Sequence, residues 1–445
     1  MTGRGEQAVA SALAGAFLAG DWTASELFER GSTTLGRRPR WLRRVVVEVL
    51  SLYREAPVDR PRELATVVLA TDGFQAAASP AQRHEGPPLR VVRILVEPTR
   101  MVRSRWPVAR VDTVTDLADL LELGVGHLTW YADTAGMQRR TRVQALQLYR
   151  YRWLDRPGRA PRLLEIPKPR LRRAQRLLLD RIVARVPAHA AARGFVPGRS
   201  ARTGATPHVG TDVVIGLDLA GFFASVPAQR IYGILRVAGY PEAVAHIITG
   251  LCTTATPIAV LAAMPAGGSA DDRYALRRTL TMPHLPQGAP TSPQLANLSA
   301  YRLDCRLAGL AAALGATYTR YADDLSVSGG PDVARQAARI VGGVRRIVSD
   351  EGFRLNDGKT RVQRRAGRQT VTVIVVNDRT NAARVDYDRL RAILHNAART
   401  GAAAQNRGGH HDFHAHLLGR IAWVEALNPS RGRRLRTDFE RIDWT

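Results

Sequence analysis

The sequence predicts an α+β fold on three observations. An apolar run at 213–219 has the length and composition of a buried strand. Residues 318–328 place β-forming and alternating side chains on either side of a turn, as a half-buried hairpin does. Apolar residues at helical spacing mark 170–186 and 417–427 as helices. These patterns place strands in the middle of the chain, with helices before and after them.

The sequence pattern of the N-terminal region predicts helices. Residues 1 to about 110 form a helical extension whose role the residues do not indicate. The apolar stretch Ala8–Gly20 is too short to cross a bilayer, so we expect no membrane association. Thr113 and Asp116 form a capping box that begins a helix, which we expect to stop at Gly124. A second short helix is expected through Leu128, Trp130 and Tyr131.

Three aspartates fall at the ends of the predicted strands. Asp323 and Asp324 occupy the expected hairpin turn, where two carboxylates alone would also fit an ordinary exposed turn. Asp218 lies near the end of the apolar run, and a lone buried carboxylate is costly unless it is paired or bound to metal. We expect the three to hold two Mg²⁺ ions, which Mn²⁺ can replace, because such ions prefer carboxylate and phosphate oxygens. Two such ions suit nucleotidyl transfer by in-line displacement.

The composition is that of a protein that binds nucleic acid. Sixty-five Lys and Arg against 39 Asp and Glu give a net charge of +26, and the pI is about 11.3. A surplus of this size is typical of proteins that lie along phosphates. The two cysteines, Cys252 and Cys305, match no metal-ligand spacing and indicate a reducing compartment, so we expect a cytoplasmic protein.

Three motifs follow one another in order along the chain. An Asp-bearing strand with two aromatic residues downstream precedes a Leu-Pro-Gln-Gly-x-x-x-Ser-Pro turn, and Tyr-Ala-Asp-Asp comes last. They comprise Asp218, Phe222 and Phe223, then 285–293, then 321–324. In these motifs the chain resembles a reverse transcriptase. The resemblance implies a right-hand polymerase with fingers and palm at 111–380, a helical thumb at 381–445 and the helical extension at 1–110.

Two further elements resemble bacterial retron reverse transcriptases. The Asn-Ala-x-x-His element of that group stands here as Gly204 to His208, and its Val-Thr-Gly element as Val371 to Val373. Each departs at one position, and Val in place of Gly removes backbone freedom. The resemblance implies that deoxynucleotides are joined on a structured noncoding RNA template, primed by a guanosine 2′-OH, to give branched RNA-linked DNA. It also implies a separate effector protein and a role in anti-phage defence.

The resemblance also implies roles for individual residues. Catalysis and metal binding fall to Asp218, Asp323 and Asp324. Contacts to the incoming nucleotide fall to Arg162, Lys168, Phe223, Gln287, Gly288 and Lys359. Contacts to RNA fall to Arg172, Arg176, His208 and Thr372. Phe223 would lie beneath the sugar and exclude a 2′-hydroxyl, although a core aromatic also fits that position. Lys359 would lie near the leaving pyrophosphate, although a solvated lysine fits as well.

Four histidines at 410, 411, 414 and 416 surround Asp412. A helix could present His410 and His414 together, as metal sites do. No cysteine accompanies them, however, and an apolar helix follows. Short His-rich tracts are compositional evidence only, so we expect partly protonated rings against RNA phosphates and no specific metal site.

Two alternative functions remain at this point. A reverse transcriptase of a group II intron or of another defence system would share the catalytic residues but not the elements at 204–208 and 371–377. A catalytically silent RNA-binding scaffold would have no need of three clustered carboxylates.

Overall fold

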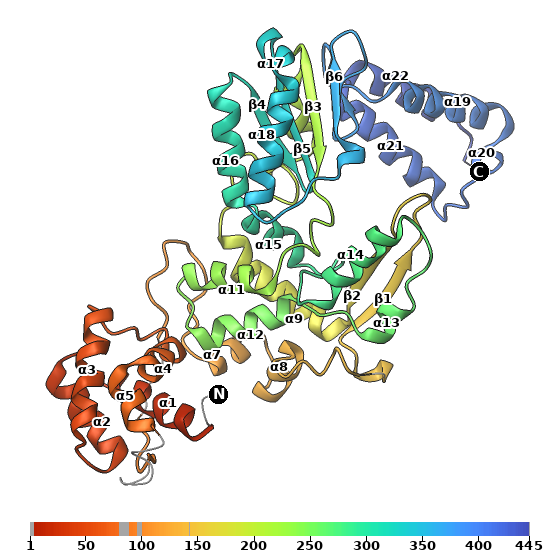
Figure 1. Ribbon diagram of the computed structural model, residues 1–445. Helices are drawn as coiled ribbons and strands as arrows, with labels where there is room; N and C mark the ends of the chain where they lie inside the picture. The colour runs from red at the N-terminus through yellow and green to blue at the C-terminus, as the bar shows by residue number, and fades with distance from the viewer. Residues whose placement is uncertain (1–3, 80–88, 96–99, 142, 445) are drawn as a thin grey trace. The chain divides into compact units, whose positions relative to one another are not determined.

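The chain folds as two units, each drawn from two separate segments of the sequence. The computed structural model describes residues 4–79, 89–95, 100–141 and 143–444 (Figure 1). Unit one comprises residues 1–186 and 226–292, and unit two comprises 187–225 and 293–445. In the described part of the chain, no helix is long and apolar enough to cross a membrane.

The first helices of unit one enclose a core of their own. They are α1 (Arg4–Leu18), α2 (Ala24–Leu35), α3 (Arg40–Leu52), α4 (Pro61–Ala70) and α5 (Asp72–Ala78). Leu13, Phe17, Leu42 and Phe74 are fully buried between them. The buried Glu242 carboxylate accepts the backbone N–H groups of Arg62 and Glu63 at 2.7 and 3.1 Å, at the N-terminus of α4. A carboxylate is favoured there because the first turn of a helix has unpaired donors.

The rest of unit one is a two-stranded hairpin surrounded by helices. Its strands are β1 (Tyr149–Leu154) and β2 (Arg162–Pro167), paired antiparallel. Its helices are α7 (Val114–Leu120), α8 (Val125–Ala132), η1 (Gln144–Leu146), α9 (Pro169–Arg181), η2 (Val183–Arg185), α11 (Ala228–Val237), α12 (Glu242–Cys252), α13 (Ile258–Ala262) and α14 (Ala270–Thr281). The helix predicted over 170–186 is therefore shorter, with a 3-10 turn at its end.

The capping box at Thr113 is confirmed, but the predicted stop at Gly124 is wrong. The Thr113 side chain accepts the Asp116 N–H, and the Asp116 carboxylate accepts the Thr113 N–H. α7 ends at Leu120 because Glu122 takes the left-handed conformation, with φ 56°. Gly124 instead precedes the first residue of α8.

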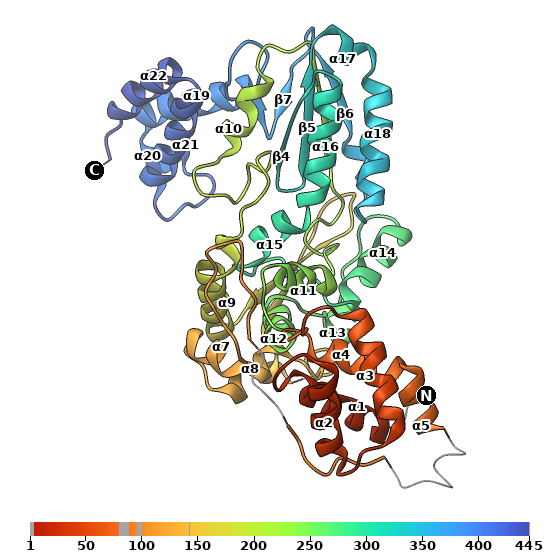
Figure 2. The ribbon, with the colours of Figure 1, turned by 90° about the vertical axis from the view of Figure 1, so that its left-hand side faces the viewer.

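Unit two is built on a four-stranded antiparallel sheet in the order β4-β5-β3-β6. The strands are β3 (Val213–Asp218), β4 (Thr317–Tyr321), β5 (Asp324–Gly329) and β6 (Arg361–Arg364). Its helical elements up to β6 are α10 (Ala201–Ala205), η3 (Thr206–His208), α15 (Ser292–Ser299, whose first residue belongs to unit one), α16 (Tyr301–Ala313), α17 (Pro331–Arg335), α18 (Ala337–Asp350) and η4 (Asp357–Lys359). α16 and α18 lie side by side along the sheet (Figures 1 and 2). The helix predicted from 294 to 310 is interrupted at Ala300.

Side-chain alternation gives the two faces of this sheet different contents. Tyr318 and Arg320 of β4 point toward α16, where both bond to Asp304. Thr319 lies between them and points to the opposite face, where it meets His208 of η3. In the strand register, Asp218 and Asp324 share the face of Thr319. The catalytic candidates and the α16 contacts therefore lie on opposite sides.

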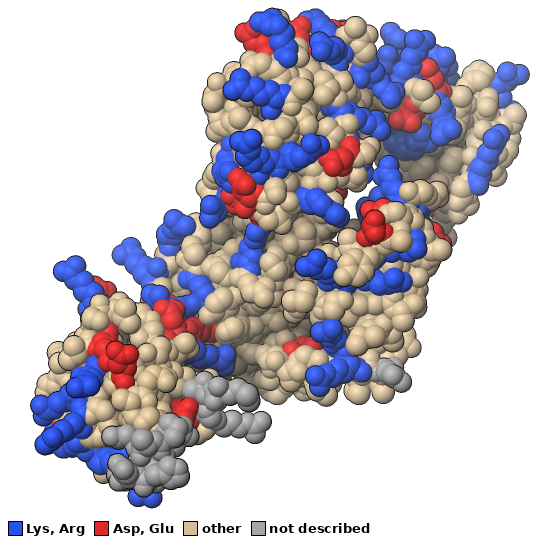
Figure 3. All heavy atoms as spheres, viewed as in Figure 1, with Lys and Arg blue, Asp and Glu red and all other residues tan. Residues whose placement is uncertain are grey.

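The last part of unit two is helical. It contains the short strands β7 (Thr370–Val371) and β8 (Ile374–Val375) and the helices α19 (Arg384–Thr400), α20 (Ala402–Gln405), α21 (Phe413–Leu427) and α22 (Pro429–Glu440). Leu394, Leu417, Ile421 and Leu435 are fully buried in their shared core. α22 adds a strongly basic surface with arginines at 431, 433, 434 and 436. Figure 3 shows basic side chains gathered over this end of the chain.

The turn between β7 and β8 is strained. Thr372 and Val373 both have positive φ, 46° and 63°. A two-residue hairpin of this type favours Gly or Asn, and a β-branched side chain is disfavoured there. The loss of backbone freedom expected from Val at 373 therefore falls on a position where the fold requires the left-handed conformation.

We predict that Val373→Gly raises the free energy of unfolding by up to about 1 kcal/mol, because relief of left-handed strain outweighs the added flexibility of the unfolded chain. Val373 is 79 % exposed, so no buried contact is lost. The measurement is urea denaturation beside Val371→Gly, which removes a buried side chain and should destabilise the protein. A destabilised Val373→Gly variant would contradict the strain at this turn.

Candidate active site

The three aspartates predicted to act together lie at one end of the sheet of unit two. Asp218 is the last residue of β3 and pairs directly with Asp324, the first residue of β5. Asp323 lies in the two-residue connection between β4 and β5, so the predicted hairpin turn is confirmed. Its backbone carbonyl accepts the Leu219 N–H at 2.9 Å, which ties the turn to the end of β3.

The electrostatics of this end of the sheet favour a bound cation. Burial first, and then the charges of Asp323 and Asp218, raise the pKa of Asp324 to about 6, against the opposing charge of Lys359. Lys359 donates to Asp218 Oδ2 at 2.6 Å. Like charges directly opposite one another on a sheet are destabilising. Carboxylates gathered in this way therefore fit hard divalent cations, which bind carboxylate oxygens and complete their shell with water and substrate phosphates.

These carboxylates are not arranged as a closed protein cage for a metal. Among the described residues, no group of three or more His, Cys, Asp or Glu side chains has that arrangement. An ion that also binds substrate phosphate does not need one, because Mg²⁺ is commonly held by one or two carboxylates together with the phosphates.

A buried arginine stabilises the turn that contains Asp323, from the opposite face of the sheet. Arg320 is fully buried and donates to both carboxylate oxygens of Asp304, at 2.8 and 2.6 Å. It also donates to Asn297 Oδ1 at 2.9 Å and to the Ala322 carbonyl at 3.0 Å. Ala322 has φ 54°, which is strained for a residue with a side chain. The guanidinium therefore stabilises the strained residue that places Asp323.

Asp304 and Asn297 were not singled out by the sequence patterns. The available signal was polar residues within apolar helical segments, Asn297 in Leu295–Leu298 and Asp304 in Leu303–Leu307. Such positions require a buried partner, but the sequence does not say which of the 65 basic residues supplies it.

We predict that Asp304→Asn lowers the free energy of unfolding by about 3–5 kcal/mol, because it leaves the Arg320 charge buried without its counterion. The matched control is Asp350→Asn, which removes an ion pair to Arg306 of similar length, 2.7 Å, between groups that are 38 % and 48 % exposed. That control should cost at most about 1 kcal/mol. Equal losses in chemical denaturation would show that Arg320 does not depend on Asp304.

Phenylalanine rings lie beside the carboxylates. Phe222 is 4 % exposed and lies under the Arg320 guanidinium, 5.5 Å from its ring centre, so it is a core aromatic. Phe223 is only half-buried and contacts the ring of Phe195, with centroids 6.2 Å apart. The expected role of Phe223 at the sugar remains a proposal, and its partial exposure is compatible with it.

In unit one, Gln287 and Gly288, which are expected to contact the nucleotide, pack against β2. The Gln287 carbonyl accepts the Glu165 N–H at 2.9 Å. Gly288 has φ 137°, and a Cβ there would lie 2.9 Å from the Glu165 carbonyl oxygen, so the close approach requires glycine. Arg162 begins the same strand and its side chain is exposed.

A buried ion pair that sequence reasoning missed lies behind this turn. The Glu165 carboxylate contacts His284 Nε2 at 2.8 Å and accepts the Thr256 hydroxyl at 2.8 Å. His284 Nδ1 lies 2.7 Å from the Met282 carbonyl. Burial lowers the pKa of His284, but the charge and hydrogen bond of Glu165 and the Met282 carbonyl outweigh it, and the net pKa is raised.

The remaining basic candidates lie on or next to α9. The Lys168 ammonium donates to the carbonyls of Gln144 and Ala145, at 2.7 and 3.0 Å, so it already has protein partners. Arg172 and Arg176 are exposed and line a hollow of about 430 Å³ together with Lys168. Thr372 lies partly exposed in the β7–β8 turn.

The expectation that His208 contacts RNA is corrected by its burial. The side chain is 0 % exposed, and its Nδ1 and Nε2 lie 2.7 Å from Ser328 Oγ and Thr319 Oγ1. The Thr319 hydroxyl donates to the Gly204 carbonyl, so it accepts from Nε2–H, and Nδ1 accepts from Ser328. Burial lowers the pKa of His208 to about 4, as a neutral ring requires. Its role is to join η3 to the sheet.

We predict that His208 makes the protein less stable as the pH falls from 6.5 to about 4. In that range the unfolded ring binds a proton that the folded ring does not, so the unfolded state gains. The loss is on the order of 3 kcal/mol. Denaturation at pH 7, 5.5 and 4 should show a weaker pH dependence for His208→Gln. Identical slopes for both proteins would contradict a neutral His208.

The histidine tract does not present His410 and His414 together, because α21 begins only at Phe413. His410 stacks on His416, with centroids 3.7 Å apart, whereas His414 faces Phe439 and Trp444. The Asp412 side chain accepts the Ala415 N–H as the N-cap of α21. The Asp412 carboxylate therefore caps the N-terminus of α21.

Comparison with known proteins agrees with this geometry. Residues 155–384 match the family described as reverse transcriptase (RNA-dependent DNA polymerase). Asp218, Asp323 and Asp324 lie within the matched range. The match defines the class of protein as a polymerase with fingers, palm and thumb.

Curated relatives narrow the class. The chain is 40 % identical over 349 residues to the retron Mx65 reverse transcriptase of Myxococcus xanthus, which covers 77 % of this chain and 74 % of that protein. It is 36 % identical to the retron Mx162 reverse transcriptase of the same organism, over 78 % of this chain and 71 % of that protein. It is 27 % identical to the retron Ec86 reverse transcriptase of Escherichia coli, over 66 % and 81 %. The chain belongs to the bacterial retron-type reverse transcriptases and is an RNA-directed DNA polymerase.

Proposed function

We propose that this polymerase copies a structured noncoding RNA, primes from a guanosine 2′-OH in that RNA, and yields branched RNA-linked single-stranded DNA. The observation that carries the proposal is the set of three carboxylates at the end of the sheet, in a chain of the retron type. We further propose that the protein acts in the cytoplasm, in anti-phage defence, with a separate effector protein.

The chemistry is assigned to residues of this chain. Asp218, Asp323 and Asp324 hold two Mg²⁺ ions, which Mn²⁺ can replace; when bound, such ions activate the attacking hydroxyl and stabilise the leaving pyrophosphate. Lys359, beside Asp218, supplies a positive charge to the leaving group. Phe223 excludes a 2′-hydroxyl from the sugar position.

Basic residues are assigned to bind the incoming triphosphate and the RNA template. Arg162 and Lys168 contact the triphosphate, and Gln287 and Gly288 border the sugar and base. Arg172 and Arg176 contact RNA phosphates, and so do the arginines of α22. Thr372, in the strained turn, contacts the cognate RNA. Phosphate contacts hold any RNA, so preference for one RNA requires local contacts of this kind.

We predict that the purified protein makes DNA on the RNA encoded beside it without an added primer, and that the product stays linked to RNA until a debranching enzyme cuts the 2′,5′ bond. Asp323→Asn should abolish the synthesis and leave RNA affinity unchanged within about threefold, because phosphate contacts elsewhere supply that affinity. Asp332→Asn, in an exposed ion pair with Arg335, is the control and should be fully active.

Two results would contradict these assignments. Near wild-type synthesis by Asp323→Asn would remove the aspartates from catalysis. Synthesis that always needs an added primer and gives unbranched DNA would favour a different reverse-transcriptase activity.

A further inference from the structure

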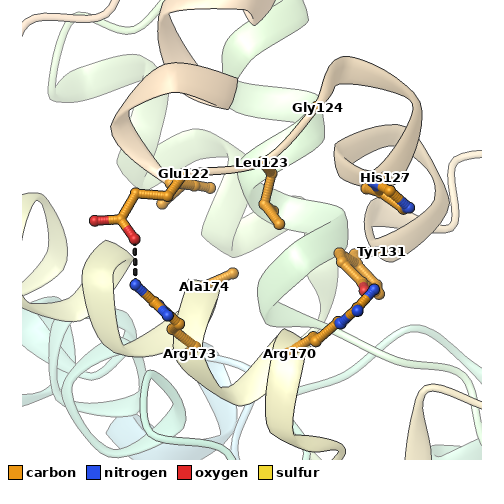
Figure 4. A pocket seen from close by; sticks show the side chains of 9 residues that line it. Glu122, Leu123, Gly124, His127, Tyr131, Arg170, Arg173 and Ala174 are labelled. Carbon is orange, nitrogen blue, oxygen red and sulfur yellow. Dashed lines mark hydrogen bonds and ion pairs between the residues drawn. The ribbon is translucent and has the colours of Figure 1, made fainter.

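A small hollow lies in unit one between the α7–α8 turn and the start of α9. Its volume is about 270 Å³ (Figure 4). Leu121 and Ala174, which are 2 % and 1 % exposed, form an apolar floor. The hollow is smaller than the roughly 300–1,000 Å³ of drug-sized ligand sites, so it suits one planar group and not a duplex.

Two aromatic rings form one wall of this hollow. His127 and Tyr131 are one helical turn apart on α8, and their rings are nearly parallel, with centroids 6.4 Å apart and an interplanar angle of 20°. His127 is exposed and Tyr131 half-buried. The Arg170 side chain extends toward Tyr131 (Figure 4). A tyrosine face stacks on any nucleobase, and a guanidinium beside it can bind a phosphate.

Arg173 lies at the rim and is ion-paired with Glu122. Glu122 is the left-handed residue that ends α7. The Leu123 N–H, which follows it, donates to the Ala118 carbonyl at 2.9 Å and closes the end of the helix. This helix end fixes an acidic group beside Arg173. The carboxylate competes with any anion for Arg173, so its removal should strengthen anion binding.

Arg173 also lines the hollow of about 430 Å³ that holds Arg172 and Arg176. Arg150 and Lys168 complete its basic lining, and of the described residues that line it none is acidic. A positively charged track that continues into an aromatic pocket is the arrangement by which proteins hold single-stranded nucleic acid.

We propose that these two hollows form a site for a single-stranded RNA segment, with phosphates along Arg150, Arg172 and Arg176 and one unpaired base against Tyr131. The site rests on the proposed RNA-copying function and deepens it, because it extends the RNA contact of Arg172 and Arg176 to Arg150 and to the aromatic pocket, which lie outside the catalytic set. It binds unpaired RNA, because duplex bases are not free to enter the pocket.

Binding to a fluorescein-labelled 20-nucleotide oligo(U) by the full chain tests the site. Tyr131→Ala should weaken binding about tenfold, as loss of one base stack does, while Tyr131→Phe should bind as wild type. The matched control is Trp130→Ala, which removes the neighbouring aromatic, 41 % exposed and outside the pocket lining, and should not change the affinity.

Charge changes give effects of opposite sign. Arg170→Ala should weaken binding and reduce the slope of log affinity against log salt by about 0.7. Glu122→Gln should tighten binding, because it frees Arg173 from its carboxylate. Arg181→Ala, at the far end of α9 and outside both hollows, is the charge control. A hairpin duplex RNA of equal length should show no effect of Tyr131→Ala.

Extension of a supplied DNA primer on an unrelated template should be near wild type for the two control variants, Trp130→Ala and Arg181→Ala, which lie outside both hollows. Failure of the branched-product assay in a protein that binds oligo(U) as described would overturn the proposed function and leave this site standing. The site is overturned if Tyr131→Ala and Trp130→Ala bind alike, if Tyr131→Phe binds as weakly as Tyr131→Ala, or if Glu122→Gln weakens binding. Unchanged oligo(U) affinity in all variants would also overturn it and favour a protein occupant.

Discussion

The ion pair between Arg320 and Asp304 is the constraint on which the end of the sheet with the three aspartates depends. Both side chains are fully buried, and removing charges from water is costly unless their hydrogen bonds are satisfied. Here Asp304 accepts both guanidinium contacts and the Tyr318 hydroxyl, and the guanidinium also donates to Asn297 and to the Ala322 carbonyl. The last bond extends this network to the turn between β4 and β5, since Ala322 is the strained residue directly before Asp323.

The alternation of side chains along the strands explains why Arg320 stabilises the turn from the face of the sheet opposite Asp218 and Asp324. Carboxylates this close repel one another until a cation binds, and in the proposed function they must stay accessible to metal ions and substrate. A cationic side chain of the protein placed among them would compete with such a metal ion. Because successive residues of β4 point to opposite faces, Arg320 lies with α16 while Asp218 and Asp324 lie on the other face. The positive charge of Arg320 is therefore kept away from these two carboxylates. Lys359, which is 30 % exposed, is the exception, because it contacts Asp218.

Sequence patterns predicted the parts of the molecule that local rules determine. The strand ending at Asp218, the hairpin turn at Asp323 and the capping box at Thr113 each follow from spacing and residue type within a few positions. His208 could not be placed in this way. Its motif marks the family, but whether its ring faces solvent or the interior depends on Thr319 and Ser328, which are more than a hundred residues away.

The end of α7 is another difference. It was expected at Gly124 because glycine is the usual left-handed residue, yet Glu122 takes that conformation and bonds to Arg173 of α9. The Lys168 ammonium likewise has partners that the sequence does not indicate, the carbonyls of Gln144 and Ala145. Contacts between residues this far apart in the sequence have no local signature.

Unit one contains a second buried ion pair, between Glu165 and His284, which also stabilises a turn next to a strand. The Gln287–Gly288 turn rests on β2 through the backbone of Glu165, and the side chain of that residue holds His284. Both nitrogens of His284 face oxygen atoms, a carbonyl and a carboxylate, and a carbonyl can only accept. A neutral ring would have to use its proton at Nδ1 and would then need a proton on Glu165. The pair therefore keeps one proton more than a neutral His and an ionised Glu would carry.

The raised pKa of His284 sets how this pair affects stability at different pH. Its contribution to the free energy of unfolding is complete below the unfolded pKa near 6.5 and is lost only as the pH rises through the folded pKa. Its pH response is thus opposite to that of His208, whose burial without a counterion favours the neutral ring. Each unit thus buries a histidine in a different protonation state, because one histidine has a carboxylate partner and the other has two hydroxyls.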